Sequence, residues 1–577
     1  MLPGIEWRLF LAAWIAYAGF HQGGGWSQNA RFAQVRAIAE QGRLDVDAYL
    51  VYAGVRDAPR GPQLVRAPVA GGLFEVDGRR YALTWPDGRP LVGELPAGAA
   101  PAPLERVAAS GDVAFAGGRL FPNKAPGTTW LAVPAYLAIH RLWLWRGVDP
   151  DDWWALTLAA WLSTALGVGL ASAAGCVLLR RAALRLWPEA PRAATGAALA
   201  FAFATPFFPY ATLFFEQAPA AVALLAAFDR LCAAPGLAAG RARTHALAFA
   251  GLAAGAAVAT SYLAALALPF LLLYLARGEG GLRGIPAFAA GLAPPLALLA
   301  AYHQACFGSP FATAYAFQNP LFLGAAGWRG VFDAPEPLRL VAVLVSPYRG
   351  LFFHAPVLLA GAAALVAMAL RPGRRAEAAL FAAILAAHLL FNASFHAWHA
   401  GWGVGPRYLV PALPFLALPL APAFARAGKT TAALAVLSAA AMLAFTAVDA
   451  QPSVGSSPIA ERPDRSRLWR EPLGEYALPI LWSGRAGPIL EAQGAGPAGA
   501  ERPLAHFRGP VSANPIGVYE AWIGTRFRPP APELAWNSFN AGELLLPGRR
   551  ASLGFLLVPL ALAISALRAS PPRARAG

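Results

Sequence analysis

Long apolar stretches alternate with short polar ones along almost the whole chain of 577 residues. The apolar runs hold roughly 16–25 residues, the length that a helix needs to cross the hydrocarbon core of a bilayer. A buried core could account for one or two such runs, but not for about a dozen. The pattern therefore predicts an all-α polytopic membrane protein with about 12 transmembrane helices, at residues 9–24, 153–178, 194–208, 212–229, 245–260, 262–276, 284–302, 352–370, 377–393, 408–424, 431–448 and 551–567.

Composition agrees with this class. Hydrophobic residues make up 57% of the chain and charged residues only 14%, whereas a soluble protein carries about 25% charged residues. The formal net charge of +16 could suggest nucleic acid, but much of the arginine lies in short loops between apolar runs, where positive charge sets topology. We therefore expect the lipid bilayer, and no nucleic acid, as a partner. The three cysteines lie in or beside apolar runs, so no disulfide framework is expected.

The short loops on one side of the predicted bundle are all basic. They hold Arg180, Arg181, Arg185, Arg230, Arg241, Arg243, Arg277, Arg283, Arg371, Arg374, Arg375, Arg426 and Lys429, and the C-terminal tail adds Arg568, Arg573 and Arg575. The positive-inside rule places this side in the cytoplasm. We expect a multi-pass protein of the inner (cytoplasmic) membrane with both termini cytoplasmic. The first apolar run lacks a small-residue cleavage site and is predicted to be retained.

Three outer segments follow from this topology, at 22–152, 303–350 and 449–550. The predicted organisation is a transmembrane domain at 1–448 with its first outer loop at 22–152, an outer segment at 449–550, and a last helix with a basic tail at 551–577. Within the first loop, the alternating stretch 72–84 predicts a small β-hairpin. Residues 128–145 are apolar but carry Pro134 and His140, which favours an interfacial helix on the outer surface.

Two motifs of the first outer loop could carry chemistry. In the first, Asp45 and Asp47 alternate in an extended stretch and would share a face. Two nearby carboxylates could supply a general base or hold a divalent cation; the alternative is a solvated loop edge with a helix cap. The second motif contains Asp112, Asn123 and Lys124 and ends where the interfacial helix begins. A lysine near a helix N-terminus suits a phosphate, in a chain whose only other lysine is in a cytoplasmic loop.

Further polar residues gather at the predicted outer ends of helices. Arg349, in SPYRGLFFH, and Arg407 could bind phosphate, although Arg349 could equally be an interfacial anchor. His396 and His399 have a spacing that could place both on one helical face, but no third metal ligand is identifiable. The candidates for sugar or acceptor binding are Asn29, Asn123, Glu216, Gln217, His396, Trp398, His399 and Trp402. No Walker-type phosphate loop is present, which disfavours ATP-driven transport.

Several of these motifs resemble one group of bacterial membrane proteins. The matching stretches are SQNARF, AIAEQGRLDVDAY, GDVAFAGGRLFPNKAPGTTWLAVPAYL, SPYRGLFFHAPVLL, WHAGWGVGPRYLVPALPFLALPL and NSFNAGELL. That group is similar to the GT-C glycosyltransferases, such as the dolichyl-phosphate-mannose protein mannosyltransferase and aminoarabinose transferase families. The resemblance covers nearly the whole chain apart from about 53–105 and 455–510. It implies a GT-C-like fold.

The resemblance also implies a mechanism. GT-C enzymes take a sugar from a polyprenyl-phosphate donor on the outer face and transfer it with inversion to an acceptor, here an envelope glycan, lipid or protein. By motif, the general base would be Asp45 or Asp47, with Asp112 as the alternative. Lys124, Arg349 and Arg407 would hold the lipid phosphate. This sequence departs from the family in that residues 21–29, directly after the first helix, contain no acid.

Two other classes of function are compatible with the sequence. A carrier for a lipid or glycan would place charged residues along a path through the bilayer midplane, whereas most ionisable residues lie at predicted helix ends. A non-catalytic GT-C-like scaffold would bind a glycolipid without needing the missing acid.

Overall fold

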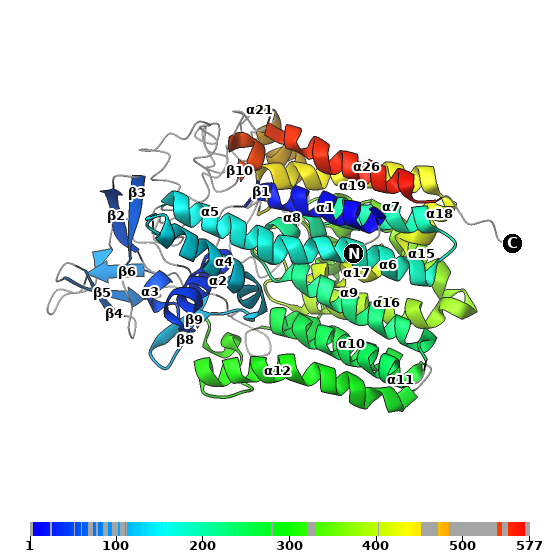
Figure 1. Cartoon of the computed structure of the whole chain (residues 1–577), viewed down its shortest axis with the longest axis horizontal. Coiled ribbons are helices and arrows are strands. Elements are labelled where there is room, and N and C mark those ends of the chain that lie inside the picture. Colours follow the sequence, from blue (N-terminus) through cyan, green and yellow to red (C-terminus); the bar gives the residue numbers. More distant parts are fainter. Residues whose placement is uncertain are drawn as a thin grey trace.

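The computed structural model is built from a long helical bundle with a smaller, strand-containing part at one end (Figure 1). The described residues are 4–451, except 23–25, 51, 59–60, 67–72, 77–78, 85–90, 95–101, 104–109, 111, 152, 239, 279–280, 320–321, 323–330 and 402, together with 471–483, 539–544 and 552–571. Most of the predicted outer segment 449–550 therefore lies outside the described residues, and the proposed domain division stays a prediction.

Helices run back and forth along the bundle. In chain order the main ones are α1 (Gly4–Ala18), α5 (Trp153–Thr164), α6 (Leu170–Leu186), α7 (Pro191–Phe203), α8 (Phe207–Thr212), α9 (Gln217–Ala233), α10 (Arg241–Thr260), α11 (Leu268–Arg277), α12 (Ile285–Phe307), α15 (Val357–Ala369), α16 (Arg375–Ser394), α17 (Leu413–Ala417), α18 (Leu420–Arg426), α19 (Gly428–Val448) and α26 (Leu557–Ala569). Each of the twelve predicted ranges overlaps one or more of them, which confirms the all-α polytopic class.

The lengths of these helices differ from the prediction. In the part of the chain that the structure describes, six helices are long and apolar enough to cross a membrane, and a bent pair, Arg407–Ala417 with Leu420–Arg426, makes a seventh. Three more predicted spans are shorter apolar helices, Tyr262–Arg277, Val357–Ala369 and Leu553–Ala569. The predicted helix 194–208 ends at Phe203, where the Thr205 hydroxyl accepts a hydrogen bond from the Phe207 amide and starts a separate helix. The helix predicted at 212–229 begins only at Gln217.

Proline and helix irregularities explain these breaks. A proline removes a backbone donor and interrupts the helical hydrogen bonds, and α14 (Leu351–His354) is separated from α15 by Pro356. Pro419 lies at the 50° bend between α17 and α18. The segment Ala165–Gly169 forms a π-helix, η3, that joins α5 and α6 into one span.

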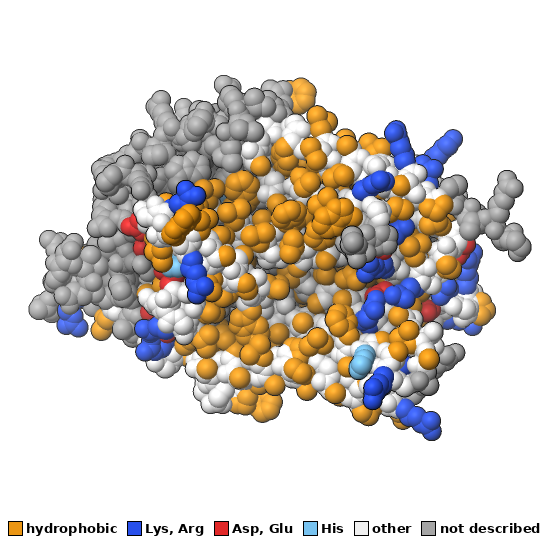
Figure 2. Space-filling view, viewed as in Figure 1, with side chains coloured by type: hydrophobic (Ala, Val, Ile, Leu, Met, Phe, Trp, Pro, Cys, Tyr) orange, Lys and Arg blue, Asp and Glu red, His pale blue; other side chains and the backbone are white. Residues whose placement is uncertain are grey.

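One end of the bundle collects the basic loops. Glu6 of α1 forms ion pairs with Arg180 and Arg181 at the end of α6. Ser570, directly after α26, is 2.7 Å from the Thr195 hydroxyl, which in turn accepts from Arg180. The first and last helices therefore have their terminal ends together at this basic end. A broad hydrophobic surface separates the Lys and Arg side chains of the two ends (Figure 2). That the basic end faces the cytoplasm stays a prediction.

Helices α10 and α12 pack with their backbones in close contact. A Cβ atom on Gly291 would lie 1.7 Å from the Ala248 carbonyl oxygen, and one on Gly251 would lie 1.9 Å from the Phe288 carbonyl oxygen. Small residues at such a crossing let two membrane helices approach closely. The pair thus depends on glycine at these two positions.

The opposite end holds the short helices and strands of the first loop. They are α2 (Trp26–Arg36), the π-helix η1 (Ala37–Gln41), α3 (Asp47–Leu50), α4 (Gly127–Trp145), β2 (Tyr52–Ala58), β3 (Gly61–Arg66), β4 (Leu73–Val76), β5 (Arg79–Thr84), β6 (Leu91–Glu94), β7 (Ala102–Pro103), β8 (Val113–Ala116) and β9 (Arg119–Pro122). The predicted hairpin at 72–84 is confirmed as the antiparallel pair β4 and β5. The helix predicted at 128–145 is α4, which packs on α2 and α5; its position at the membrane surface stays a prediction.

A small strand pair ties the two ends of the sequence together. β1 (Phe20–His21) directly follows the first helix and pairs antiparallel with β10 (Phe539–Asn540), with Phe20 opposite Asn540. The Asn540 amide donates to the Ser552 hydroxyl, just before the last helix. Helices α1 and α26 also pack along each other.

Candidate functional site

A tight hairpin brings Asp112 and Asn123 together. β8 and β9 are joined by Gly117 and Gly118, whose φ angles of 56° and 75° are those of a two-residue hairpin turn that favours glycine. At the open end of the hairpin, the Asn123 backbone N–H donates to the Asp112 carbonyl at 3.2 Å, and its side-chain amide donates to the Asp112 carboxylate at 3.3 Å. The hairpin thus fixes a carboxylate at its base.

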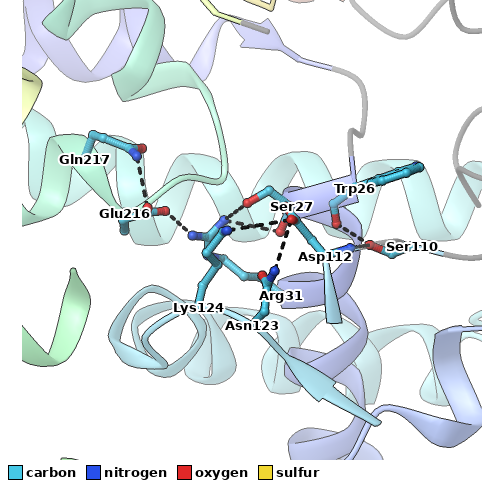
Figure 3. Close-up of polar contacts among 9 residues, drawn as sticks. All are labelled: Trp26, Ser27, Arg31, Ser110, Asp112, Asn123, Lys124, Glu216 and Gln217. Atoms are coloured by element: carbon cyan, nitrogen blue, oxygen red, sulfur yellow. Dashed lines mark hydrogen bonds and ion pairs between the residues drawn. The ribbon is translucent and has the colours of Figure 1, made fainter. Parts of the chain in front are cut away.

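Ser110 fastens this hairpin to the start of α2. Its hydroxyl donates to the Trp26 carbonyl at 2.6 Å and accepts from the Asp112 backbone N–H at 3.2 Å. The hairpin therefore supplies a carboxylate beside the segment that follows the first membrane helix, where the sequence itself has no acid. Figure 3 shows Asp112 lying between Ser27 of α2 and the Asn123–Lys124 stretch.

Lys124 lies in a mixed charged and aromatic environment. Its ammonium is 3.6 Å from the Asp112 carboxylate, and it lies 5.7 Å from the ring centres of Tyr315 and Phe322. Burial lowers the pKa of Lys124, an effect that the negative charges of Asp112 and Glu216 partly oppose. A partly desolvated ammonium binds an anion more strongly than one in water.

The third element is an ion pair between Arg31 and Glu216. Arg31, on α2, is fully buried, and it donates to the Glu216 carboxylate and to the Ser27 carbonyl at 3.2 Å. Glu216 directly precedes α9, and its other carboxylate oxygen accepts from the Gln217 amide at 3.0 Å. The pair connects the segment between α1 and α4 to the bundle (Figure 3).

Arg407 completes the cluster and lies near the same Phe215 ring as Arg31. Its guanidinium lies 5.3 Å from the Phe215 ring centre and 5.4 Å from that of Tyr408, while Arg31 lies 5.7 Å from the same Phe215 ring. Arg407 makes no ion pair with any described residue. Arg31, Lys124 and Arg407 thus outnumber the acids Asp112 and Glu216, so the cluster, here called the outer charged cluster, carries a net charge of +1 and suits an anionic ligand.

Several buried polar atoms of the outer charged cluster lack a hydrogen-bond partner among the described residues. They are Arg31 Nε, Asn123 Oδ1, Gln217 Oε1 and Arg407 Nε. Buried polar groups are nearly always hydrogen-bonded, and each exception needs an explanation. Four buried polar atoms without a partner in one cluster are consistent with a site where a polar ligand would form these hydrogen bonds.

Arg349, also predicted to bind phosphate, instead holds a neighbouring loop in place. It is buried, it lies 4.7 Å from the ring centre of Tyr348, and it donates to the Gly401 carbonyl at 2.6 Å. It therefore holds the loop that contains Trp398 and His399. Trp398 is buried against Tyr348, with its carbonyl bound by Asn392.

Asp45 and Asp47 lie in a separate network. Asp45 pairs with Arg43 at 3.0 Å and with Arg119 at 3.2 Å. Asp47 begins α3 and accepts from the Leu120 backbone N–H at 2.8 Å. Both carboxylates therefore hold the β8–β9 hairpin against α3, and burial raises the pKa of Asp47 to about 7.

The two histidines do not share a helical face as predicted, because α16 ends at Ser394 and both lie in the turn that follows. His396 donates to the Phe322 carbonyl at 2.9 Å, and the His399 ring accepts from the Gly401 backbone N–H at 3.0 Å. Within the described ranges, no three His, Cys, Asp or Glu side chains converge as a metal site. Asn29 is buried on α2, and Trp402 lies outside the described residues.

The sequence analysis missed two residues of the site, Arg31 and Ser110. Arg31 is four residues after Ser27, a spacing that puts both on one face of a helix. This spacing could have indicated from the sequence that the two residues are in contact. The contact of Ser110 with Trp26 joins positions far apart in the chain, and no local pattern indicates it.

Comparisons with known proteins give similarity only at the level of structure. No family model matches the chain, and no curated protein matches it significantly. The chain is similar in fold to ArnT from Cupriavidus metallidurans. The structure bound to undecaprenyl phosphate is 15% identical, covers 98% of this chain and 77% of its own, and gives a TM-score of 0.44. The apo structure is 15% identical, covers 96% and 75%, and gives a TM-score of 0.41.

Proposed function

We propose that this protein is a membrane glycosyltransferase of the GT-C type, which transfers a sugar from a polyprenyl-phosphate donor to an acceptor in the cell envelope. The observation that carries the proposal is the outer charged cluster. It combines one carboxylate held by a hairpin with three cationic side chains and several unpaired buried polar atoms at one end of a membrane bundle.

In this proposal the cations hold the donor phosphate. Lys124 and Arg407 provide positive charge beside an apolar, aromatic wall, which suits a phosphate attached to a lipid. Arg31 is held by Glu216, so its role is to position α2 and to add to the positive field. As the sugar leaves the phosphate, negative charge on the phosphate rises, and preorganised cations stabilise that change.

Asp112 is the proposed general base. Its carboxylate takes the proton of the acceptor hydroxyl while that oxygen attacks the anomeric carbon. The bond between this carbon and the phosphate oxygen breaks, and polyprenyl phosphate leaves with the electron pair, which inverts the configuration. Asp45 and Asp47 are less suited, because arginine side chains and a backbone amide already occupy their oxygens.

The test is sugar transfer by the purified protein in lipid nanodiscs. A panel of radiolabelled polyprenyl-phosphate sugars is supplied together with an envelope extract as acceptor source, and released polyprenyl phosphate and labelled product are measured. The proposal is rejected if no donor in the panel loses its sugar in the presence of the wild-type protein.

Matched variants identify the base. Asp112→Asn removes the base and should lower kcat by about 100-fold or more, the range of general base catalysis. Asp149→Asn changes the same charge in the loop between α4 and α5, away from the β8–β9 hairpin, and should retain most of the activity. Donor binding by Asp112→Asn, measured with a non-transferable analogue, distinguishes a lost base from a lost site. Full activity in Asp112→Asn would remove Asp112 from the mechanism.

A further inference from the structure

A cavity lies at the basic end of the bundle, away from the outer charged cluster. It is bordered by α9, α10, α11, α12 and α16 and has a volume of about 680 Å³, within the range of about 300–1,000 Å³ typical of sites for small ligands. Its lining includes Leu231, Leu247, Phe270, Leu273 and Leu380. The cavity is therefore apolar along most of its wall.

Positive charge lines this apolar cavity. Arg243, Arg277 and Arg283 contribute to the lining, and Arg243 is held in place by donating to the Ala234 carbonyl at 3.1 Å. Arg277 and Arg283 are exposed and form no ion pair with any described residue. The cavity thus has basic groups with capacity to bind an anion.

Among the described lining residues, the one acid does not neutralise Arg277 and Arg283. Glu377 accepts a hydrogen bond from the Tyr274 hydroxyl at 3.3 Å, and its nearest described cation is Arg374 at 4.0 Å, which is not part of the lining. Within the described lining, Arg277 and Arg283 are therefore left without an acidic partner, and the glutamate already has its own contacts. This balance favours a ligand with at least one negative charge.

The cavity lies beside helices whose surfaces face outward from the bundle. Helix α12 presents most of its surface outward, since only 11% of its most apolar stretch is buried. Leu273, on the wall formed by α11, is 44% exposed. An occupant of the cavity would be in contact with the acyl chains around the bundle as well as with the arginines.

We infer that this cavity binds a phospholipid with an anionic headgroup, whose phosphate lies among Arg243, Arg277 and Arg283 and whose chains follow the wall of α11 and α12. A free phosphate would use the arginines alone and leave the apolar wall unoccupied. The inference is independent of the proposed transferase activity, because the cavity shares no residue with the outer charged cluster.

The test measures lipid retention by native mass spectrometry on protein from nanodiscs that contain phosphatidylcholine with or without phosphatidylglycerol. The variant Arg277→Gln with Arg283→Gln should retain about 25-fold less phosphatidylglycerol, since each arginine near an anionic lipid changes binding roughly fivefold. The control, Arg371→Gln with Arg568→Gln, removes the same charge at exposed positions of the same end outside the cavity and should change retention by less than about twofold.

Three outcomes would overturn the inference. Equal losses in both double variants would show a general attraction of the basic end to anionic lipid. Equal retention of phosphatidylcholine and phosphatidylglycerol by the wild type would remove the role of the arginines. Complete displacement of phosphatidylglycerol by inorganic phosphate at about equal concentration would identify a phosphate site without a lipid component.

Discussion

The ion pair between Arg31 and Glu216 joins the segment between α1 and α4 to the membrane bundle, and its removal should have a distinctive cost. Arg31 is fully buried, and the Glu216 side chain is only 13% exposed. Glu216→Gln would leave the arginine charge buried with the Ser27 carbonyl, the Ser27 hydroxyl and the Phe215 ring as its remaining contacts. The variant keeps the shape of the side chain, so the electrostatic change dominates.

The expected loss follows from this geometry. Breaking a buried pair by removing one partner costs about 3–5 kcal/mol, and the remaining contacts of Arg31 place Glu216→Gln near the lower end, at about 3 kcal/mol. Arg31→Met should cost less, about 2 kcal/mol, because the Glu216 carboxylate keeps the Gln217 amide and some solvent. The double variant leaves no buried charge without a partner, so its loss should be smaller than the sum of the two single losses by about 2 kcal/mol.

Thermal denaturation of the four proteins in one detergent measures this coupling. The double variant should denature at a temperature equal to or above that of Glu216→Gln alone. A control cycle on Arg374 and Glu377, a more exposed pair at 4.0 Å, should show coupling of about 0–1 kcal/mol. Strictly additive losses at Arg31 and Glu216 would refute the reasoning, because they would mean that the two charges do not stabilise each other.

Three further predictions concern other parts of the molecule. Gly291→Val places side-chain atoms against the Ala248 carbonyl and should destabilise the protein by at least about 1–3 kcal/mol, seen as a lower denaturation midpoint. Asp47→Asn should flatten the pH dependence of stability: the folded carboxyl has a pKa of about 7 and the unfolded one about 3.8, so the folded state binds the proton more tightly, and stability of the wild type falls as pH rises from about 4 to 7. Lys124→Gln should raise the donor KM by about tenfold or more, since a charged hydrogen bond contributes about 1.5–3 kcal/mol.

Each of these predictions has a control or a result that would contradict it. Gly373→Ala adds a methyl group where the backbone leaves open space and should leave the midpoint unchanged; equal losses at both glycines would contradict the packing argument. A pH profile of stability in Asp47→Asn that matches the wild type would contradict the assignment. Lys124→Arg keeps the charge and should have a donor KM between those of the wild type and Lys124→Gln. A donor KM of Lys124→Gln equal to that of the wild type would exclude a charge effect.

The helices could be predicted from the sequence because their signal is local. Runs of apolar residues place nearly every membrane helix, and alternation places β4 and β5. Their ends are less predictable, because breaks such as those at Thr205 and Pro356 depend on how a helix end packs and is capped. Neither the length of a run nor its hydropathy contains that information.

The candidate site was only partly predictable for a similar reason. Asp112, Asn123 and Lys124 are neighbours in one motif, so their proximity follows from the hairpin. The contact of that motif with Arg31, Glu216 and the start of α2 depends on tertiary packing. Asp45 and Asp47 show the opposite case. Their spacing in the sequence is typical of a general base, but in the structure their carboxylates bind residues of the β8–β9 hairpin.

The pairing of β1 with β10 has a consequence for how the chain is made. Phe20 emerges from the ribosome long before Asn540, its partner in the strand pair, and at bacterial elongation rates the delay is on the order of a minute. During that interval the outer end of the first helix has no strand partner, and the surface later covered by α26 faces lipid or an insertion factor. Shortening or tagging the C-terminus should therefore affect membrane insertion and assembly of the N-terminal region as well as the tail itself.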